Sequence, residues 1–170
     1  MGIEGRLTVV LRLAALLCCL PAMAAAEENL GWHGGKAEQG AVLFYGIPQS
    51  GYAPISFACP EGRSELVFVF AFAPIEAVDG VQVEVLLQAG DIEVPIATTG
   101  MRIEMDDSFI LEGRTVLDAR LADLLTSRGT LHVFVEDGAE EFPLDGAREA
   151  AAALIETCAT ACKQCGDECR

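Results

Sequence analysis

The chain is poor in the side chains that most catalytic and nucleic-acid-binding sites need. It has two histidines, His33 and His132, one tryptophan, and 11 basic residues against 26 acidic ones. Nucleophilic catalysis needs a serine or cysteine with a base in reach, and histidine is the usual base. The chain also lacks the Gly-x-Ser-x-Gly, His-Glu-x-x-His, Gly-x-Gly-x-x-Gly and phosphate-loop patterns. We assign no catalytic residue and no cofactor, and we expect a protein that is not an enzyme.

The shortage of basic residues leaves the chain strongly acidic, with a formal net charge of −15 at pH 7. A surface of this sign repels phosphate backbones and anionic lipid headgroups, which argues against binding to nucleic acid or directly to a membrane. The charge serves solubility in any case. It also favours a cationic partner, either a protein or a small molecule.

No apolar run in the sequence is long enough to span a membrane, and a short apolar run lies near the N-terminus. Two arginines precede an apolar stretch over residues 13–20, and a proline and Ala22-Met23-Ala24 follow it. This order is typical of a secretory signal peptide, and the run is shorter than the ~20 residues of a spanning helix. We predict a signal peptide over residues 1–24, cleaved after Ala24 or Ala26, and a periplasmic or secreted protein. An uncleaved anchor is the alternative. Cleavage after Ala24 removes two arginines and one glutamate, a net +1, and leaves a charge of −16.

Residues 25–157 are predicted to form one β-rich domain that includes the start of a C-terminal helix. Apolar positions alternate with polar or small ones in short runs bounded by glycine and proline. The predicted strands are residues 41–45, 55–59, 66–72, 81–87, 92–96, 101–105, 109–111 and 130–135. Residues 66–72 are apolar at every position, which predicts a central strand covered on both faces. Residues 31–35 are rich in glycine and are expected to be irregular, and Pro95 predicts an edge or a bulge.

Helical spacing appears in two places. Leu117, Leu121, Leu124 and Leu125 predict one short helix, which Arg128-Gly129 is expected to end. A second helix is expected to start near Asp145 and to run through an alanine-rich stretch. We therefore predict a mainly β fold, an antiparallel β-sandwich or half-barrel, with one short internal helix and a C-terminal helix.

Five cysteines follow the predicted signal peptide: Cys59, Cys158, Cys162, Cys165 and Cys169. Because exported proteins are oxidised, disulfide bonding is the preferred interpretation. We predict a bond between Cys59 and Cys158 that attaches the last helix to a strand. A second bond would form within the cysteine-rich tail, residues 158–170, if Cys169 folds back to Cys162 or Cys165. The fifth thiol would stay free or join another chain.

Two other chemistries are open for the tail. Cys162-Lys163-Gln164-Cys165 has the spacing of thiol–disulfide oxidoreductases, but it is expected near a helix C-terminus, where the dipole raises a thiol pKa. Four thiolates along one helix cannot surround a single metal ion, although Cys162 and Cys165 with His33 are candidate ligands. A thiol-redox or metal-handling protein is therefore the alternative to a structural role for these cysteines.

The order of features also suggests a family. A signal peptide, the early Trp32, the strand Phe57-Ala58-Cys59 and the entry Pro143-Leu144-Asp145-Gly146-Ala147 to a last helix closing on Cys158 are found together. This order resembles that of small uncharacterised periplasmic proteins of proteobacteria and, more distantly, the invasion-associated locus B family. From the export signal, the cysteines and the lack of catalytic motifs we predict an exported, disulfide-stabilised, non-enzymatic protein that binds a partner or is associated with the cell envelope. The resemblance supplies no catalytic residues, and the cysteines beyond Cys158 depart from the family pattern.

Overall fold

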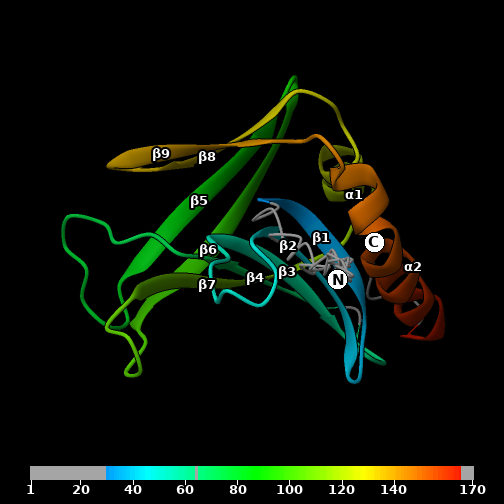
Figure 1. Ribbon diagram of the computed structural model, residues 1–170, viewed down its shortest axis with the longest axis horizontal. Helices are drawn as coiled ribbons and strands as arrows, with labels where there is room; N and C mark the ends of the chain where they lie inside the picture. Colours follow the sequence, from blue (N-terminus) through cyan, green and yellow to red (C-terminus); the bar gives the residue numbers. More distant parts are fainter. Residues whose placement is uncertain (1–29, 64, 166–170) are drawn as a thin grey trace, which may run out of the picture.

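The computed structural model of the protein describes residues 30–63 and 65–165, with side chains as far as Cys158. Within these residues nine strands form one antiparallel sheet, and two helices lie against it (Figure 1). The elements are β1 (Gly31–Ala37), β2 (Gly40–Gly46), β3 (Ile55–Pro60), β4 (Glu65–Phe70), β5 (Gln82–Ala89), β6 (Ile92–Arg102), β7 (Phe109–Val116), α1 (Ala119–Leu125), β8 (Thr130–Val135), β9 (Gly138–Pro143) and α2 (Ala147–Cys165). The predicted fold class is confirmed. The predicted signal peptide, residues 1–24, lies outside the described residues.

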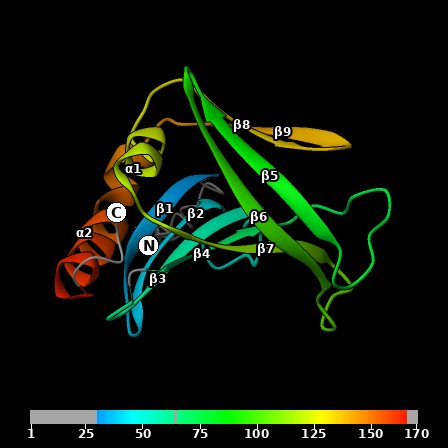
Figure 2. The same ribbon diagram turned by 180° about the vertical axis from the view of Figure 1, so that it is seen from behind.

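The sheet is strongly curved (Figures 1 and 2). Its strand order is β1-β2-β3-β4-β7-β6-β5-β8-β9, so β1 and β9 are the two edges. A side chain of one edge bonds the backbone of the other: the indole N–H of Trp32 in β1 donates to the backbone carbonyl of Pro143 in β9 at 2.7 Å. Beside this bond the ring of Tyr45 contacts the ring of Phe142 edge-on, with 5.2 Å between centroids. The fold is therefore a half-barrel whose edge strands are joined by side chains at one end.

The concave face of the sheet carries the core, because alternate side chains of each strand point inward. In β4, Leu66, Phe68 and Phe70 are fully buried, whereas Val67 and Val69 are half-buried on the outer face. The prediction that this strand is covered on both faces is therefore wrong. It is central, fourth of nine, but no element packs over its outer valines among the described residues.

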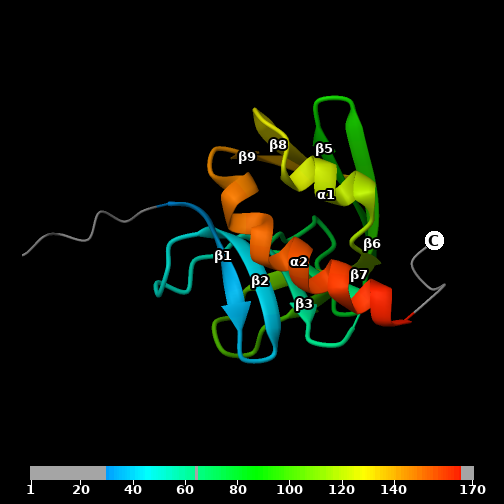
Figure 3. The same ribbon diagram turned by 90° about the vertical axis from the view of Figure 1, so that its right-hand side faces the viewer.

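Helix α2 packs on the inner face of β1, β2 and β3, with α1 beside it (Figure 3). Its buried side is a stripe of small and apolar side chains at helical spacing: Ala147, Ala151, Leu154 and Cys158. Cys158 is joined to Cys59 of β3 by a disulfide, with 5.9 Å between the Cα atoms. This is the predicted pairing, and it attaches the last helix to the sheet across 99 residues of sequence.

Residues 31–35, expected to be irregular, are instead part of strand β1. The prediction failed because glycine is unfavourable in a strand when only local preferences count. Here one glycine is required by packing: a Cβ at Gly34 would stand 2.2 Å from the backbone oxygen of Ala150 in α2. The helix approaches β1 so closely that only glycine fits at this position.

The two strands predicted at residues 92–96 and 101–105 are one long strand, β6, which ends at Arg102. Pro95 lies inside it without breaking it. β7 pairs with β6 only from Thr98 onward, so at Pro95 the side of β6 away from β5 has no partner strand. Proline is tolerated there because no ladder hydrogen bond needs its missing N–H.

Helix α1 is shorter than predicted, because it begins at Ala119, after Leu117, and ends at Leu125. The carboxylate of Asp118 caps the helix by accepting the N–H of Leu121 at 2.8 Å. The predicted stop at Arg128-Gly129 is wrong, since α1 ends at Leu125 with Thr126 as its C-cap. The hydroxyl of Thr126 donates to the carbonyl of Ala122 at 2.9 Å, so a local side chain ends the helix in place of a C′ glycine.

Candidate functional site

Strands β5 and β8 separate along part of their length. The paired segment is short, with Leu86–Gln88 of β5 opposite His132–Phe134 of β8. β5 itself starts at Gln82, so its first half has a partner, β6, on one side only. β8 meanwhile ends at Val135 and turns into β9 through Glu136 and Asp137. The divergence leaves a space beside the first half of β5.

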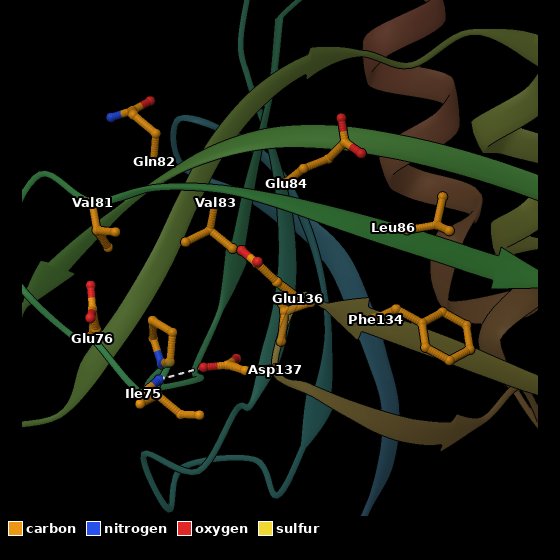
Figure 4. Close-up of a pocket in the computed structure, with 12 residues that line it drawn as sticks. Ile75, Glu76, Val81, Gln82, Val83, Glu84, Leu86, Phe134, Glu136 and Asp137 are labelled. Carbon is orange, nitrogen blue, oxygen red and sulfur yellow. Dashed lines mark hydrogen bonds between the residues drawn. The ribbon is translucent and has the colours of Figure 1, made fainter.

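This space is an open pocket of about 820 Å³, within the range of about 300–1,000 Å³ that is common for ligand sites. We call it the β5–β8 pocket (Figure 4). Its lining comes from the β4–β5 loop, from the first half of β5 and from the end of β8: Pro74, Ile75, Glu76, Val81, Gln82, Val83, Glu84, Leu86, Phe134, Val135, Glu136 and Asp137. Within β5, side chains of both faces line it. The pocket therefore runs along the edge of the strand and not over one of its faces.

Apolar side chains form much of its wall. Val81 directly precedes β5 and Val83 lies near its start, and Leu86 stands opposite Phe134 in the β5–β8 pair. Phe134 is 36% exposed and Ile75 is 87% exposed. Such large apolar side chains at the mouth of a pocket are typical of interaction sites.

All four charged side chains that line the pocket are carboxylates: Glu76, Glu84, Glu136 and Asp137. Figure 4 shows Glu136 and Asp137 on the side of β5 to which Val83 points, and Glu84 on the other side. No lysine or arginine is among the lining residues. A partly enclosed apolar site with charges of one sign concentrates its field, so the pocket attracts cations.

The far wall of the pocket, the β4–β5 loop, is attached to the β8–β9 turn. The backbone N–H of Ile75 donates to the carboxylate of Asp137. Earlier in the loop, Phe72 stacks on Phe70 with 5.5 Å between ring centroids, and it packs against Gly138 so closely that a Cβ there would lie 2.6 Å from the ring. These contacts hold the loop and the turn as one wall, so the described residues already form the pocket without a ligand.

The lining provides groups that can bind a ligand. None of its twelve residues is serine, threonine, cysteine, histidine or lysine. What it provides is carboxylate oxygens, one amide side chain at Gln82 and apolar surface. These groups select a ligand that carries positive charge and apolar groups together.

The histidines lie elsewhere. His33 is in β1, on the face opposite Gly34 and hence opposite α2, with its ring 5.4 Å from that of Phe44. His132 is in β8, with Nδ1 3.3 Å from a carboxylate oxygen of Glu141 and its ring stacked on Phe134 at 6.0 Å. Of the predicted metal ligands, His33 therefore points away from the helix that leads to the tail. In the described part of the chain, no three histidine, cysteine or acidic side chains gather as a metal site would require.

The remaining tail predictions fall where the structure gives no side chains. Cys162 and Cys165 lie in the last turns of α2, and their side chains are outside the described residues, as is Cys169. The second disulfide, the redox pair and the metal set at these positions stay predictions. Neither helix of the described chain is long and apolar enough to cross a membrane.

The pocket was not predicted from the sequence, although a local signal was present. Along β5 the outward positions are Gln82, Glu84, Leu86 and Gln88, and along β8 they are Thr130, His132 and Phe134. One large apolar residue interrupts each polar row. These two, Leu86 and Phe134, face each other where the strands diverge. Apolar residues at outward positions of two separate strands are a sign of a binding surface, but their proximity requires the sheet order.

Comparisons with protein-family models, with curated proteins and with solved structures give no match. The resemblance to small periplasmic proteins and to the invasion-associated locus B family therefore stays a prediction.

Proposed function

We propose that this chain is an exported, non-enzymatic binding protein whose ligand is cationic and partly apolar, and that the ligand occupies the β5–β8 pocket. One observation carries the proposal: four carboxylates and no basic side chain line a pocket with apolar walls. A ligand with positive charge and apolar groups matches both properties at once.

The disulfide supports the part of the proposal that concerns location. A bond between Cys59 and Cys158 is compatible with an oxidising compartment, such as the periplasm or the outside of the cell. Residues 1–24 supply the export signal in this proposal. The same compartment would contain the ligand, and envelope association is one way in which the protein would reach it.

Export and oxidation are tested together by expressing the full chain in a bacterial host and isolating it from the periplasm. We expect the mass of a chain that begins after Ala24 or Ala26. We also expect the Cys59–Cys158 bond and at most one free thiol. A mass that retains residues 1–24, or four to five free thiols after export, would contradict the proposal. The second result would favour the thiol-redox or metal-handling alternative.

Binding is tested with an end-capped peptide of four Lys-Val repeats as the probe, with four Glu-Val repeats as the control, by calorimetry at low and high salt. We expect the basic peptide alone to bind, and to bind more weakly as salt screens the charges. Replacing Glu84 and Glu136 by glutamine should weaken binding about three- to tenfold, since exposed ion pairs contribute little each. The control removes the same charge at Glu38 and Glu61, which do not line the pocket. Equal losses in the two double variants would show that net charge, and not this pocket, attracts the peptide.

A further inference from the structure

The edge of β5 that borders the pocket presents backbone groups without a strand partner. The carbonyl of Val81 accepts the N–H of Gly100 and the carbonyl of Val83 accepts the hydroxyl of Thr98, each at 2.7 Å. These carbonyls therefore point toward β6. Backbone groups alternate in direction along an antiparallel strand, so those of Gln82 and Glu84 point away from β6 and into the pocket.

The paired part of β5 follows the same alternation. The register places Leu86, Leu87 and Gln88 opposite Phe134, Val133 and His132 of β8. Of these, Leu86 and Gln88 have the parity of Gln82 and Glu84, so their backbone groups point toward β8. The edge that bonds β8 thus continues beyond the point where β8 leaves it. The row of backbone donors and acceptors extends over two more residues on this side, where the open pocket leaves them accessible to a ligand.

We infer that the ligand of the β5–β8 pocket is an extended peptide segment of a partner protein, which pairs with Gln82 and Glu84 of β5 as an added strand. Main-chain hydrogen bonds supply affinity in this mode, and side-chain pockets at alternate positions supply specificity. The inference rests on the proposed function, because it specifies the ligand of the same pocket.

The register follows from the two faces of β5. A peptide residue directly opposite Gln82 or Glu84 directs its side chain outward, as they do, next to the Glu84 carboxylate. The residues between direct theirs inward, toward Val81 and Val83. The segment that fits best therefore alternates basic and apolar residues, with the basic residues in the hydrogen-bonded positions.

A second copy of the chain is a poorer occupant. Pairing β5 with another β5 would bring like charges at Glu84 together, and each chain cleaved after Ala24 has a net charge of −16. Charged residues on an edge strand commonly prevent such self-pairing. The carboxylate that repels a second copy attracts a basic strand, so the same edge discriminates between the two.

The decisive measurement uses the exported protein and three capped peptides of four Lys-Val repeats. One is unmodified, one is methylated at the backbone nitrogen of every lysine, and one is methylated at the backbone nitrogen of every valine. Methylation of a backbone nitrogen removes a main-chain hydrogen-bond donor and leaves the side-chain charge unchanged. We expect methylation at lysine to reduce affinity at least tenfold and methylation at valine to leave it within about threefold. Equal affinities of the two methylated peptides, or the reverse order, would overturn the inference and leave the proposed function standing. Failure of the unmodified peptide to bind would remove both.

Amide exchange measured by NMR locates the pairing on the protein. The N–H groups of Gln82 and Glu84 should exchange at least tenfold more slowly when the unmodified peptide is bound. Unchanged exchange with peptide bound would overturn strand addition. If these N–H groups exchange slowly in the protein alone, and more slowly as the protein concentration rises, a second copy of the chain occupies the edge. That result would also overturn the inference of a partner peptide.

A pair of variants at one position separates the backbone from the charge. Glu84→Gln removes the carboxylate, and Glu84→Pro removes the carboxylate and the N–H. Proline is tolerated on a free strand edge, and circular dichroism checks that both variants fold. We expect Glu84→Pro to bind the unmodified peptide at least fivefold more weakly than Glu84→Gln. Equal affinities with unchanged spectra would overturn a role for this N–H.

Discussion

The backbone oxygen of Ala150 in α2 lies 2.2 Å from the point where a Cβ on Gly34 of β1 would stand. No side chain fits between them, so the helix and the strand are in direct backbone contact. Lys36 and Glu156 form an ion pair at 3.3 Å across the same interface, but both are well exposed and contribute little stability. The absence of a side chain at position 34 is thus what lets α2 cover this part of the sheet.

Gly34→Ala is expected to lower the free energy of unfolding by about 1–3 kcal/mol or more, because the new methyl group must displace helix backbone. Gly35→Ala is the matched control, since a Cβ at Gly35 would meet nothing within 4 Å. It should change stability by less than about 1 kcal/mol. Urea unfolding followed by circular dichroism measures both, and equal effects would contradict the packing of α2 on β1.

Removing the disulfide by the double replacement of Cys59 and Cys158 with alanine should cost about 2–5 kcal/mol, since the bond closes a loop across 99 residues. Both cysteines are 1% exposed, so the lost sulfur contacts add to this cost. Reducing agent should lower the urea midpoint of the natural chain and leave that of the double variant unchanged. If reducing agent lowers the urea midpoint of the natural chain and of the double variant equally, the stabilising disulfide is not the Cys59–Cys158 bond.

Trp32→Phe removes the hydrogen bond that joins the two edge strands, while the carbonyl it frees belongs to Pro143, an exposed residue. We expect a loss of about 0.5–1.5 kcal/mol, measured by urea unfolding with circular dichroism. Tyr52→Phe is a control that changes an exposed aromatic residue outside the core. In the natural chain, fluorescence of this single tryptophan should move to longer wavelength on unfolding, because Trp32 is 7% exposed in the fold. Emission typical of exposed tryptophan before unfolding would contradict the closure of the half-barrel.

Glu140 of β9 provides a pH-dependent prediction. Burial raises the pKa of this carboxyl above its ordinary value of 4.5. Because the pKa of Glu140 is raised, the folded state holds this proton more tightly than the unfolded state does. The contribution of Glu140 to the free energy of unfolding is therefore fully present below pH 4.5 and is lost as pH rises through the folded pKa. Relative to the natural chain, Glu140→Gln should therefore gain stability at pH 7 and gain none at pH about 4.

Glu38→Gln is the control for Glu140→Gln, because it removes the same charge from an exposed position in the β1–β2 turn. Urea midpoints at the two pH values measure both variants. The same pH response in both would mean that relief of general charge repulsion, and not burial of Glu140, explains the gain.

The strands were the most predictable part of this protein. In β5, the alternation of Val83 and Val85 with Gln82 and Glu84 correctly predicts which residues face the core and which face water. The Cys59–Cys158 bond was predicted from the expected oxidising compartment and from the position of these cysteines at the end of a strand and in the last helix. These features depend on the local period of the chain and on general chemistry, both of which are visible in a single sequence.

Two errors show what local patterns cannot supply. Glycine at positions 31, 34 and 35 reads as a loop until the nearness of α2 is known, and that helix begins more than a hundred residues later. Residues 92–96 and 101–105 are predicted as two strands, whereas β6 runs unbroken from Ile92 to Arg102 because β5 pairs along most of its length. The edge predicted at Pro95 agrees with the register, since β7 pairs with β6 only from Thr98. In each case a contact distant in sequence overrides the preference of the residue itself.

The sequence by itself determined the acidic charge, the antiparallel β class, the two helices and the cysteine that holds α2. Only the tertiary structure decided that β5 continues past the end of β8, and that four carboxylates from a loop, a strand and a turn surround its free edge. The reason is physical: side-chain period is a property of one strand, whereas the length over which two strands pair depends on how the whole sheet curves.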